Sequence, residues 1–428
     1  MIAPHEYVEQ LARAARRASR ELVAVSADDR SRALERFAHA LRESGRLILE
    51  ANATDVTAAR AAGLAPALVE RLRLDERRVE AMAHGVEQIA AQPDPVGQTI
   101  ESLTRPDGLR IEKRRVPIGV VLFFYESRPN VTADAAALCI RSGNAVILRG
   151  GKEAMHSNRA IVEALRRGIA EVPASARSAS IVEAVQFLDN PDRALVPILL
   201  KLDRYIDLVI PRGGESLIRT VVAESTIPVL KHFTGNCHLY VDASARDMEQ
   251  MVRDVCVNAK TSYPGGAVCN AVEHLLFHRE AAPLVPAVCA DLARLGVEVR
   301  GDERVRELFP SAQATSPQDW DTEYLSLVVG VRMVDSLDEA IEHINEHGSH
   351  HTDGIISESR EAIERFVTRV DSASVMVNAS TRLADGGEYG LGAEIGISTD
   401  KLHARGPMGA ADLTTYKWVV TGDGHVRA

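Results

Sequence analysis

The spacing of apolar residues divides the chain into regions of different secondary structure. Residues 1–92 carry Leu, Val and Ala at helical spacing and show no strand pattern. Short apolar runs then alternate with helical patterns between residues 117 and 231, and again from about 239 to 379. Such alternation is typical of parallel, doubly wound sheets. We therefore expect two α/β domains, with helices ahead of the first.

The apolar runs define the expected strands of each block. In the first block they are residues 118–124, 145–148, 180–182, 206–210 and 227–230, with helices through 137 and near 154–170, 191–201 and 215–223. In the second block they are residues 272–277, 297–300, 327–331 and 374–377, with a further strand that begins at Cys237. The glycine-rich tail from residue 380 is expected to be mostly loop that lines a ligand.

Length and composition limit the classes of function. A chain of 428 residues, 46% of them hydrophobic, can form two or three domains with large cores. Its net charge of −10 argues against nucleic acid or an anionic membrane as a partner, and its apolar runs are too short to cross a bilayer. Five cysteines without a CxxC pair favour a reducing cytoplasm over a disulfide framework or a zinc site.

Cys269 is the strongest candidate for chemistry. It ends the loop sequence Tyr-Pro-Gly-Gly-Ala-Val-Cys, in which glycine and proline let the backbone approach a ligand and expose the thiol. Cys237 is its only rival, because the other three cysteines lie in apolar helical patterns: Cys139, Cys256 and Cys289. From the pattern alone, an inert loop thiol remains an equal alternative to a nucleophile.

Two glycine-containing turns in the first block favour phosphate binding. Each follows an expected strand, precedes a helix and carries a cation beside its glycines. Helix N-termini at the carboxyl ends of parallel strands bind anions, so the pair predicts a nucleotide cradle. The residues are Arg149, Gly150, Gly151 and Lys152 in one turn and Arg212, Gly213 and Gly214 in the other. Neither turn is a GxGxxG fingerprint, and a purely steric need for glycine is the alternative at each.

Two further polar groups have competing interpretations. Arg128 and Asn130 follow the first strand of the first block and offer a guanidinium and an amide in one turn. The structural alternative for Asn130 is an N-cap of the next helix. The histidines of the segment 347–351 lack the carboxylate and the spacing of a catalytic zinc set, so no metal is expected there: His347, His350 and His351.

Several longer runs occur along the whole chain in a family-specific order. They are residues 116–120, 126–132, 143–153, 237–242, 258–261, 268–271, 377–382, 390–399, 401–409 and 413–418. Together they closely resemble the γ-glutamyl phosphate reductase family of the aldehyde dehydrogenase superfamily. One departure is the segment 262–268 before Cys269, which is longer than the usual turn of that family.

The resemblance implies an aldehyde dehydrogenase-like α/β fold in three parts. An NADP-binding domain would comprise residues 1–102 and 117–231, and a catalytic domain would comprise residues 232–405. Residues 103–116 and 406–428 would form a small oligomerisation element, with a homodimer or a homotetramer as the assembly. No kinase precedes the cofactor block, so a separate glutamate 5-kinase is a candidate partner.

The activity implied by the resemblance is that of a cytoplasmic oxidoreductase of proline biosynthesis. It reduces L-glutamyl 5-phosphate with NADPH to L-glutamate 5-semialdehyde and releases phosphate. Cys269 becomes the nucleophile that forms a thioester, and its own backbone amide or the Asn130 amide becomes the donor to the oxyanion; Glu323 is assigned to the catalytic residues as well. His232 replaces the carboxylate that activates water in hydrolytic relatives. We expect no base beside Cys269 that could ionise a serine at this position.

Four cationic side chains are expected to contact the cofactor or the substrate. Arg149 and Lys152 stand where NAD enzymes of the superfamily commonly hold the ribose with a Lys and a Glu, and two cations suit the 2′-phosphate of NADP(H). Arg128 and Arg382 are the expected contacts of the substrate's carboxylate and phosphate. For Arg382 a structural salt bridge to Asp385 or Glu388 is an equal alternative.

Two other functions remain open at this point. One is an acylating aldehyde dehydrogenase that uses coenzyme A, and the other is an inactive scaffold of the same fold. The presence of Cys269, Asn130 and Glu323 weighs against a scaffold. Arg382 and the polar, basic tail suit a small dianionic substrate better than a pantetheine arm.

Overall fold

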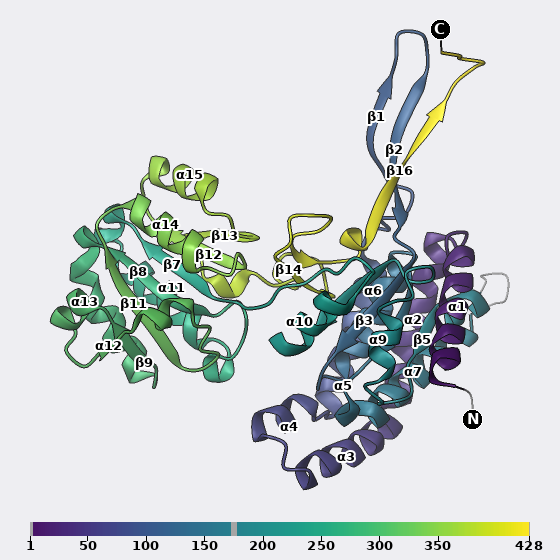
Figure 1. Ribbon diagram of the computed structural model, residues 1–428, viewed down its shortest axis with the longest axis horizontal. Coiled ribbons are helices and arrows are strands. Elements are labelled where there is room, and N and C mark those ends of the chain that lie inside the picture. The colour runs from purple at the N-terminus through teal and green to yellow at the C-terminus, as the bar shows by residue number, and fades with distance from the viewer. Residues whose placement is uncertain (1–2, 173–177, 428) are drawn as a thin grey trace. The chain divides into compact units, whose positions relative to one another are not determined.

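The computed structural model describes residues 3–172 and 178–427 and has the α/β fold that the sequence predicts (Figure 1). The chain divides into two compact units. Unit 1 comprises Met1–Lys231, Gly390–Gly396 and Met408–Ala428, and unit 2 comprises His232–Tyr389 and Ile397–Pro407. None of the helices in the described residues combines the length and the apolar composition that a bilayer crossing requires.

Unit 1 begins with the helices that residues 1–92 predict. They are α1 Pro4–Leu22, α2 Ala27–Glu43, α3 Gly45–Ala61, α4 Pro66–Leu72 and α5 Glu76–Ala91. The side chains of Ser26 and Asp75 cap α2 and α5 by accepting hydrogen bonds from the amides of Asp29 and Arg78. The apolar faces of these helices are buried, and α2 packs against α5.

A four-stranded parallel sheet of order β5-β4-β3-β6 forms the centre of unit 1. Its strands are β3 Val120–Tyr125, β4 Ala145–Arg149, β5 Val185–Phe187 and β6 Leu208–Arg212. The helices between and after them are α6 Asn130–Arg141, α7 Met155–Ala170, α8 Ser178–Glu183, α9 Leu195–Leu199 and α10 Glu215–Glu224. All six residues of β3 are buried, as expected for a strand covered on both faces. The strand order reverses between β3 and β6, which makes their carboxyl ends the expected ligand crevice.

Two expected strands of the first block are wrong. Residues 180–182 belong to helix α8, and the strand follows at Val185–Phe187. A short apolar run does not distinguish a buried helix turn from a strand. Residues 227–230 form only an isolated bridge between Val209 and Val229. Pro228 lacks the amide hydrogen that a longer ladder would need.

Unit 1 contains a second sheet, whose strands the sequence does not predict. It is antiparallel, of order β1-β2-β16, with β1 Thr99–Thr104, β2 Arg110–Pro117 and β16 Thr414–Thr421. The strand β16 pairs along the whole of β2, from Thr414 opposite Pro117 to Thr421 opposite Arg110. Figure 1 shows this sheet extending away from the helices of unit 1. It leaves Tyr416, Trp418 and Val420 exposed.

Unit 2 is a seven-stranded parallel sheet of order β10-β9-β11-β8-β7-β12-β13. Its strands are β7 Cys237–Val241, β8 Val272–His278, β9 Glu298–Gly301, β10 Gln313–Ala314, β11 Val328–Val334, β12 Thr352–Ile356 and β13 Ser374–Val377. Its helices are α11 Glu249–Thr261, α12 Val285–Arg294, α13 Glu303–Leu308, α14 Leu337–His347 and α15 Arg360–Arg369.

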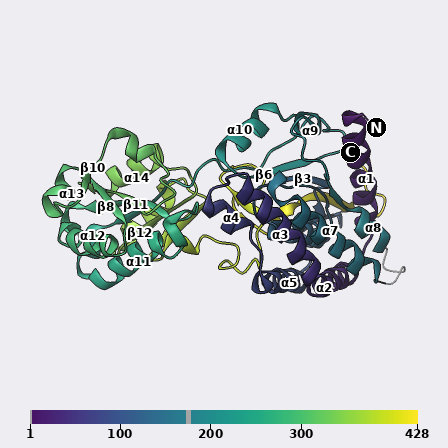
Figure 2. The same ribbon diagram turned by 90° about the horizontal axis from the view of Figure 1, so that it is seen from below.

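Both faces of the unit 2 sheet are covered. Figure 2 shows α11 and α12 on one side of the strands and α14 on the other. Adjacent residues of β7 follow this division, because Leu239 packs into the core on one face and Tyr240 into the core on the other. The tail after residue 380 is mostly loop up to residue 413, with the short strands β14 Gly396–Ser398 and β15 Gly406–Met408 paired to each other.

Candidate active site

The loop that carries Cys269 is shaped by two glycines. Gly265 and Gly266 have φ angles of +71° and +64°, a left-handed conformation that side chains other than glycine adopt only with strain. The loop leaves Cys269 partly exposed, whereas the other four cysteines are buried. The sequence prediction of a presented thiol at Cys269 is therefore confirmed.

Cys237 is hydrogen-bonded to the backbone of the Cys269 loop. Its Sγ donates a hydrogen bond to the carbonyl oxygen of Cys269 at 3.1 Å. Burial raises the pKa of the Cys237 thiol well above its ordinary value, so this thiol stays protonated. The arrangement is that of a structural cysteine behind an exposed one, which weakens Cys237 as a rival nucleophile.

Gly235 packs directly against the backbone of Cys269. A Cβ atom at position 235 would lie 1.9 Å from the Cys269 carbonyl oxygen, so only glycine fits at this contact. The Gly235 amide donates to Oε1 of Glu323 at 2.8 Å. Glu323 thus holds the segment that touches the Cys269 loop.

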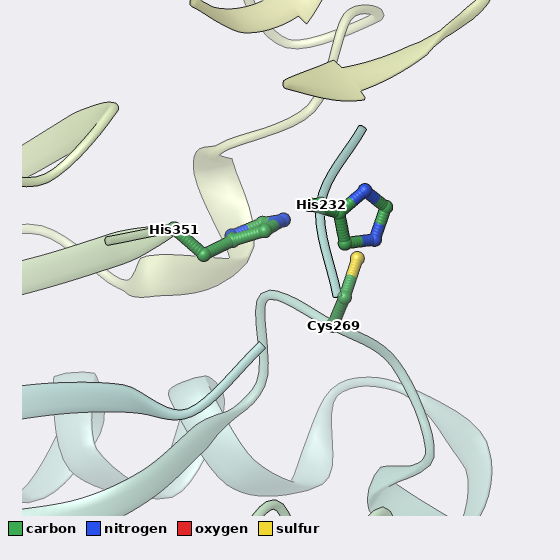
Figure 3. A group of neighbouring side chains, drawn as sticks. All are labelled: His232, Cys269 and His351. Atoms are coloured by element: carbon green, nitrogen blue, oxygen red, sulfur yellow. The ribbon is translucent and has the colours of Figure 1, made fainter. Parts of the chain in front are cut away.

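Two imidazoles flank the Cys269 thiol (Figure 3). The ligand-forming atoms of His232, Cys269 and His351 all lie within 4.8 Å of one another. His232 Nδ1 is 2.8 Å from the carbonyl oxygen of Ile397 and must donate to it, which leaves Nε2 as the ring's acceptor. The expectation that no base lies beside Cys269 is therefore wrong. His232 had been placed near the reacting carbon by the resemblance, but His351 had not.

The topology of unit 2 explains why His351 was missed. Cys269, Cys237 and His351 lie at or just before the first residues of β8, β7 and β12, which are neighbours in the parallel sheet. The site therefore forms at the amino-terminal edge of three adjacent strands, and no sequence spacing encodes that adjacency. The neighbouring histidines point to other partners: His347 Nδ1 lies 2.7 Å from Asp321 and His350 Nδ1 lies 2.6 Å from the Asp371 carbonyl.

Arg382 is held next to the Cys269 loop. Asn270 donates from Nδ2 to the carbonyl oxygen of Ala384 at 2.9 Å, which ties the two segments together. The Arg382 guanidinium lies 5.5 Å from the ring centre of Tyr263, and its buried Nε and Nη1 atoms have no hydrogen-bond partner. Within the described residues, Arg382 forms no ion pair with Asp385 or Glu388. The salt-bridge alternative is therefore wrong, and the anion contact stays a prediction.

A buried ion pair lies in the core of unit 2 and was not anticipated. Lys260 Nζ is 2.6 Å from Glu273 Oε2, and both side chains are fully buried. Burial raises the pKa of Glu273 to about 7 and lowers that of Lys260, while each partner opposes the shift of the other. The charge of Glu323 acts on both groups. Because Lys260 lies in the last turn of α11, the helix that leads into the Cys269 loop, this pair anchors the loop.

The first predicted turn of unit 1 carries a cluster of cations. The Arg149 side chain donates to the carbonyl oxygen of Gly150 at 3.1 Å, and its buried Nε has no hydrogen-bond partner. Burial lowers the pKa of Arg149; the charge of Glu153 opposes this shift, and that of Arg193 adds to it. Lys152 is exposed. Gly150 has a steric role, because a Cβ there would lie 2.1 Å from Nδ2 of Asn158.

A carboxylate lies at each of the two turns in unit 1. Glu126 accepts from the Gly214 amide at 3.0 Å, and a Cβ at Gly213 would lie 2.7 Å from the same carboxylate. Glu153, which follows Gly151 and Lys152, accepts from the amide and hydroxyl of Ser127. Arg212 lies 3.7 Å from Glu394. A phosphate at Gly213 and Gly214 would have to displace the Glu126 side chain.

Asn130 is the first residue of α6 and not its N-cap, which is Pro129, so the capping alternative is wrong. Its Nδ2 donates to Asp134 Oδ2 at 3.1 Å. Burial raises the pKa of Asp134 to about 6, and the charge of Arg212 opposes this shift. Arg128 lies in the turn between β3 and α6. The roles of Asn130 and Arg128 toward the substrate stay predictions.

Comparison with known proteins places this chain in a family. Residues 2–306 match the aldehyde dehydrogenase family. The chain is 48% identical over 421 residues to the gamma-glutamyl phosphate reductase of Caldanaerobacter subterraneus subsp. tengcongensis, covering 98% of this chain and 99% of the relative. This chain belongs to the γ-glutamyl phosphate reductases. The membership confirms the family and fold inferred from the sequence.

Solved structures agree with a γ-glutamyl phosphate reductase fold. The crystal structure of gamma-glutamyl phosphate reductase from Thermotoga maritima matches with a TM-score of 0.92 and 44% identity, over 98% of this chain and 99% of that chain. An acetylating aldehyde dehydrogenase from Geobacillus thermoglucosidasius matches with a TM-score of 0.68 at 18% identity, over 99% of this chain and 98% of that chain. The second match shows the shared fold alone. The coenzyme A alternative therefore gains no support beyond the fold.

Proposed function

We propose that this chain reduces L-glutamyl 5-phosphate to L-glutamate 5-semialdehyde with release of phosphate, a step of proline biosynthesis from glutamate. The observation that carries the proposal is the near-full-length similarity to γ-glutamyl phosphate reductases. The partly exposed Cys269 between two imidazoles supplies a nucleophile for an acyl phosphate. A separate glutamate 5-kinase is the class of enzyme that would supply the substrate.

Cys269 begins the proposed reaction. Nε2 of His232, kept as an acceptor by the bond from Nδ1 to Ile397, takes the thiol proton. The thiolate attacks the C5 carbonyl carbon, and the tetrahedral intermediate expels phosphate to leave a thioester on Cys269. The backbone amide of Cys269 and the Asn130 amide are the proposed donors to the oxyanion, and loss of one such donor costs about 100-fold or more in rate. Glu323 positions Cys269 through Gly235.

The family implies a nicotinamide cofactor, and the cations at the end of β4 fit its NADP form. When bound, the reduced cofactor supplies the hydride that converts the thioester to the aldehyde. The partnerless Nε of Arg149 and the nearby charge of Arg193 favour an anion at this edge of the sheet. We assign the 2′-phosphate of NADP(H) to Arg149 and Lys152, with Arg193 as a third cation that sequence reasoning missed.

Arg382 is the proposed contact of one anionic group of the substrate. Its guanidinium has two buried nitrogens without hydrogen-bond partners in the unit that carries Cys269. A guanidinium binds a carboxylate or phosphate through two parallel hydrogen bonds. Arg128 is the second candidate for this role.

The sheet of β1, β2 and β16 is the proposed assembly element of a homodimer or homotetramer. Tyr416, Trp418 and Val420 are each about half exposed, and alternate positions of one strand carry all three. Aromatic residues on an exposed sheet are typical of interfaces between protein chains. Size-exclusion chromatography with light scattering should show an oligomer that Trp418→Glu shifts toward the monomer.

The covalent mechanism is tested by Cys269→Ser. We expect phosphate-dependent reduction of NADP with glutamate semialdehyde to fall at least about 1,000-fold, because a serine hydroxyl is a much weaker acid than a thiol and supplies no thiolate nucleophile. NADPH affinity, measured by fluorescence titration, should be unchanged. Turnover within tenfold of wild type would refute the covalent role. A reaction that needs coenzyme A in place of phosphate would refute the proposed substrate instead.

A further inference from the structure

The atoms around Cys269 form a potential coordination set. Sγ of Cys269 and one ring nitrogen each of His232 and His351 lie within 4.8 Å of one another. In residues 3–172 and 178–427, this is the one group of three or more His, Cys, Asp or Glu side chains that converges in this way. Figure 3 shows both rings turned toward the space beside the sulfur.

The donor types select a particular class of cation. One thiolate and two imidazoles suit a borderline ion such as Zn²⁺, whereas Mg²⁺ and Ca²⁺ require oxygen ligands. Three protein ligands leave one tetrahedral position open. Zinc bonds of about 2.3 Å to sulfur and about 2.0–2.1 Å to nitrogen would place the ligand atoms roughly 3.4–3.6 Å apart. Contraction by about 1 Å from the largest spacing is sufficient.

Hydrogen bonds already orient both rings for such a role. The Nδ1–H of His232 is directed to the Ile397 carbonyl, which presents Nε2 with its lone pair. Nδ1 of His351 lies 2.9 Å from the Thr352 hydroxyl, which fixes that ring from the opposite side. Metal-binding histidines typically have their second ring nitrogen held in this way.

We propose that Zn²⁺ or a similar divalent transition-metal ion binds reversibly to Cys269, His232 and His351 and blocks the nucleophile. The metal–sulfur bond forms as the thiol proton leaves to solvent, and no group is oxidised or reduced. Water fills the open position. The sulfur lone pair that would attack the acyl phosphate is then committed to the metal. Metal and substrate therefore exclude each other at Cys269, and a chelator restores the free thiol.

Co²⁺ is the probe for the experiment, because thiolate coordination gives it a near-ultraviolet charge-transfer absorption that can be titrated without substrate. The full chain should bind one Co²⁺ with this absorption, release one proton and lose the ion to Zn²⁺. Cys269→Ser should abolish the absorption, and His351→Gln should weaken Co²⁺ binding at least tenfold. His84→Gln, which changes an exposed histidine outside the group, should bind as wild type does.

The Co²⁺ absorption is measured without catalysis, so its outcome does not depend on whether the proposed function is right. Absence of a charge-transfer band in the wild-type protein overturns the site. Equal Co²⁺ affinity in wild type and His351→Gln overturns the three-residue set. Circular dichroism monitors folding of each variant. If the buried His351→Gln variant does not fold, His232→Gln takes its place with the same tenfold criterion, because His232 is partly exposed.

Discussion

Gly235 contacts the carbonyl oxygen of Cys269 so closely that a Cβ atom at position 235 would lie 1.9 Å from it. Because the obstructing atom is backbone, the two segments must move apart to accept any side chain. We expect Gly235→Ala to shift the Cys269 loop and lower kcat about 100-fold, since small misplacements of a reacting group cost that much. Steady-state kinetics and thermal melting measure the two effects.

The matched control for this substitution is Gly45→Ala. A Cβ at Gly45 would meet only Val79 at 3.8 Å, an ordinary contact, and the position lies in helix α3. This variant should keep wild-type kinetics and melt at the same or a higher temperature. If Gly235→Ala also keeps wild-type kcat, the contact does not position Cys269.

Cofactor preference depends on Arg149 and Lys152. Charge-assisted contacts to the 2′-phosphate should favour NADP over NAD by about 1 to 3 kcal/mol. Replacing both residues with glutamine should remove most of that preference by raising the KM for NADP about 10- to 100-fold. Lys201→Gln, which removes an exposed cation elsewhere in unit 1, should leave the preference unchanged. Equal use of both cofactors by the unmodified chain would contradict the assignment.

Arg382→Lys tests the substrate contact. The substitution keeps the charge but loses the two-pronged geometry, so the KM for semialdehyde or phosphate should rise at least tenfold, about 1.4 kcal/mol. The melting temperature should change little, because the guanidinium makes no ion pair to its loop neighbours Asp385 and Glu388 in the described structure. A fall of many degrees with unchanged kinetic constants would identify Arg382 as a structural residue.

The free energy of unfolding should fall as the pH drops below about 6.5, because a buried histidine stays neutral in the folded chain and becomes protonated in the unfolded chain. Burial, together with the charges of His238 and Arg332, lowers the pKa of His343 to about 2, so the folded chain keeps this ring neutral. The unfolded chain protonates it near pH 6.5 and is stabilised as the pH falls from there. This residue alone accounts for about 2 kcal/mol of lost unfolding free energy between pH 7 and pH 5.

Urea unfolding of wild type and His343→Leu at several pH values measures this loss. The variant should lose less stability than wild type between pH 7 and pH 5, by about 2 kcal/mol. His84→Leu, at an exposed histidine, should follow the wild-type curve. Parallel curves for wild type and His343→Leu would show that His343 titrates normally in the folded state.

The sequence predicts those strands that carry an apolar run, such as all of β3 and Leu275–Phe277 of β8. The strands β3 and β8 lie within two residues of their expected bounds, because continuous buried runs are bounded by turn residues. The strand β2 was missed, since five of its eight residues are charged and only pairing with β1 and β16 makes it a strand. The strand β12 begins with Thr-Asp-Gly, and its only apolar side chains are Ile355 and Ile356, too short a run to predict a strand.

The same limit applies to the site. Cys269 could be predicted because its exposure is encoded locally, by the glycines that precede it. His351 could not, because its place beside the sulfur depends on the adjacency of β8, β7 and β12 in the sheet. The hydrogen bond from the Gly214 amide to the Glu126 carboxylate likewise joins two turns that sequence spacing does not relate.

The pairing of β16 with β2 has a consequence for biosynthesis. The hairpin of β1 and β2 leaves the ribosome about 300 residues before its third strand. At a synthesis rate of roughly 5–20 residues per second, the edge of β2 that pairs with β16 stays unpaired for about 15 to 60 seconds. An open strand edge invites pairing with other chains, and the charges of β2 limit that pairing without abolishing it. Chains truncated before residue 414 should therefore sediment as aggregates to a greater extent than completed chains.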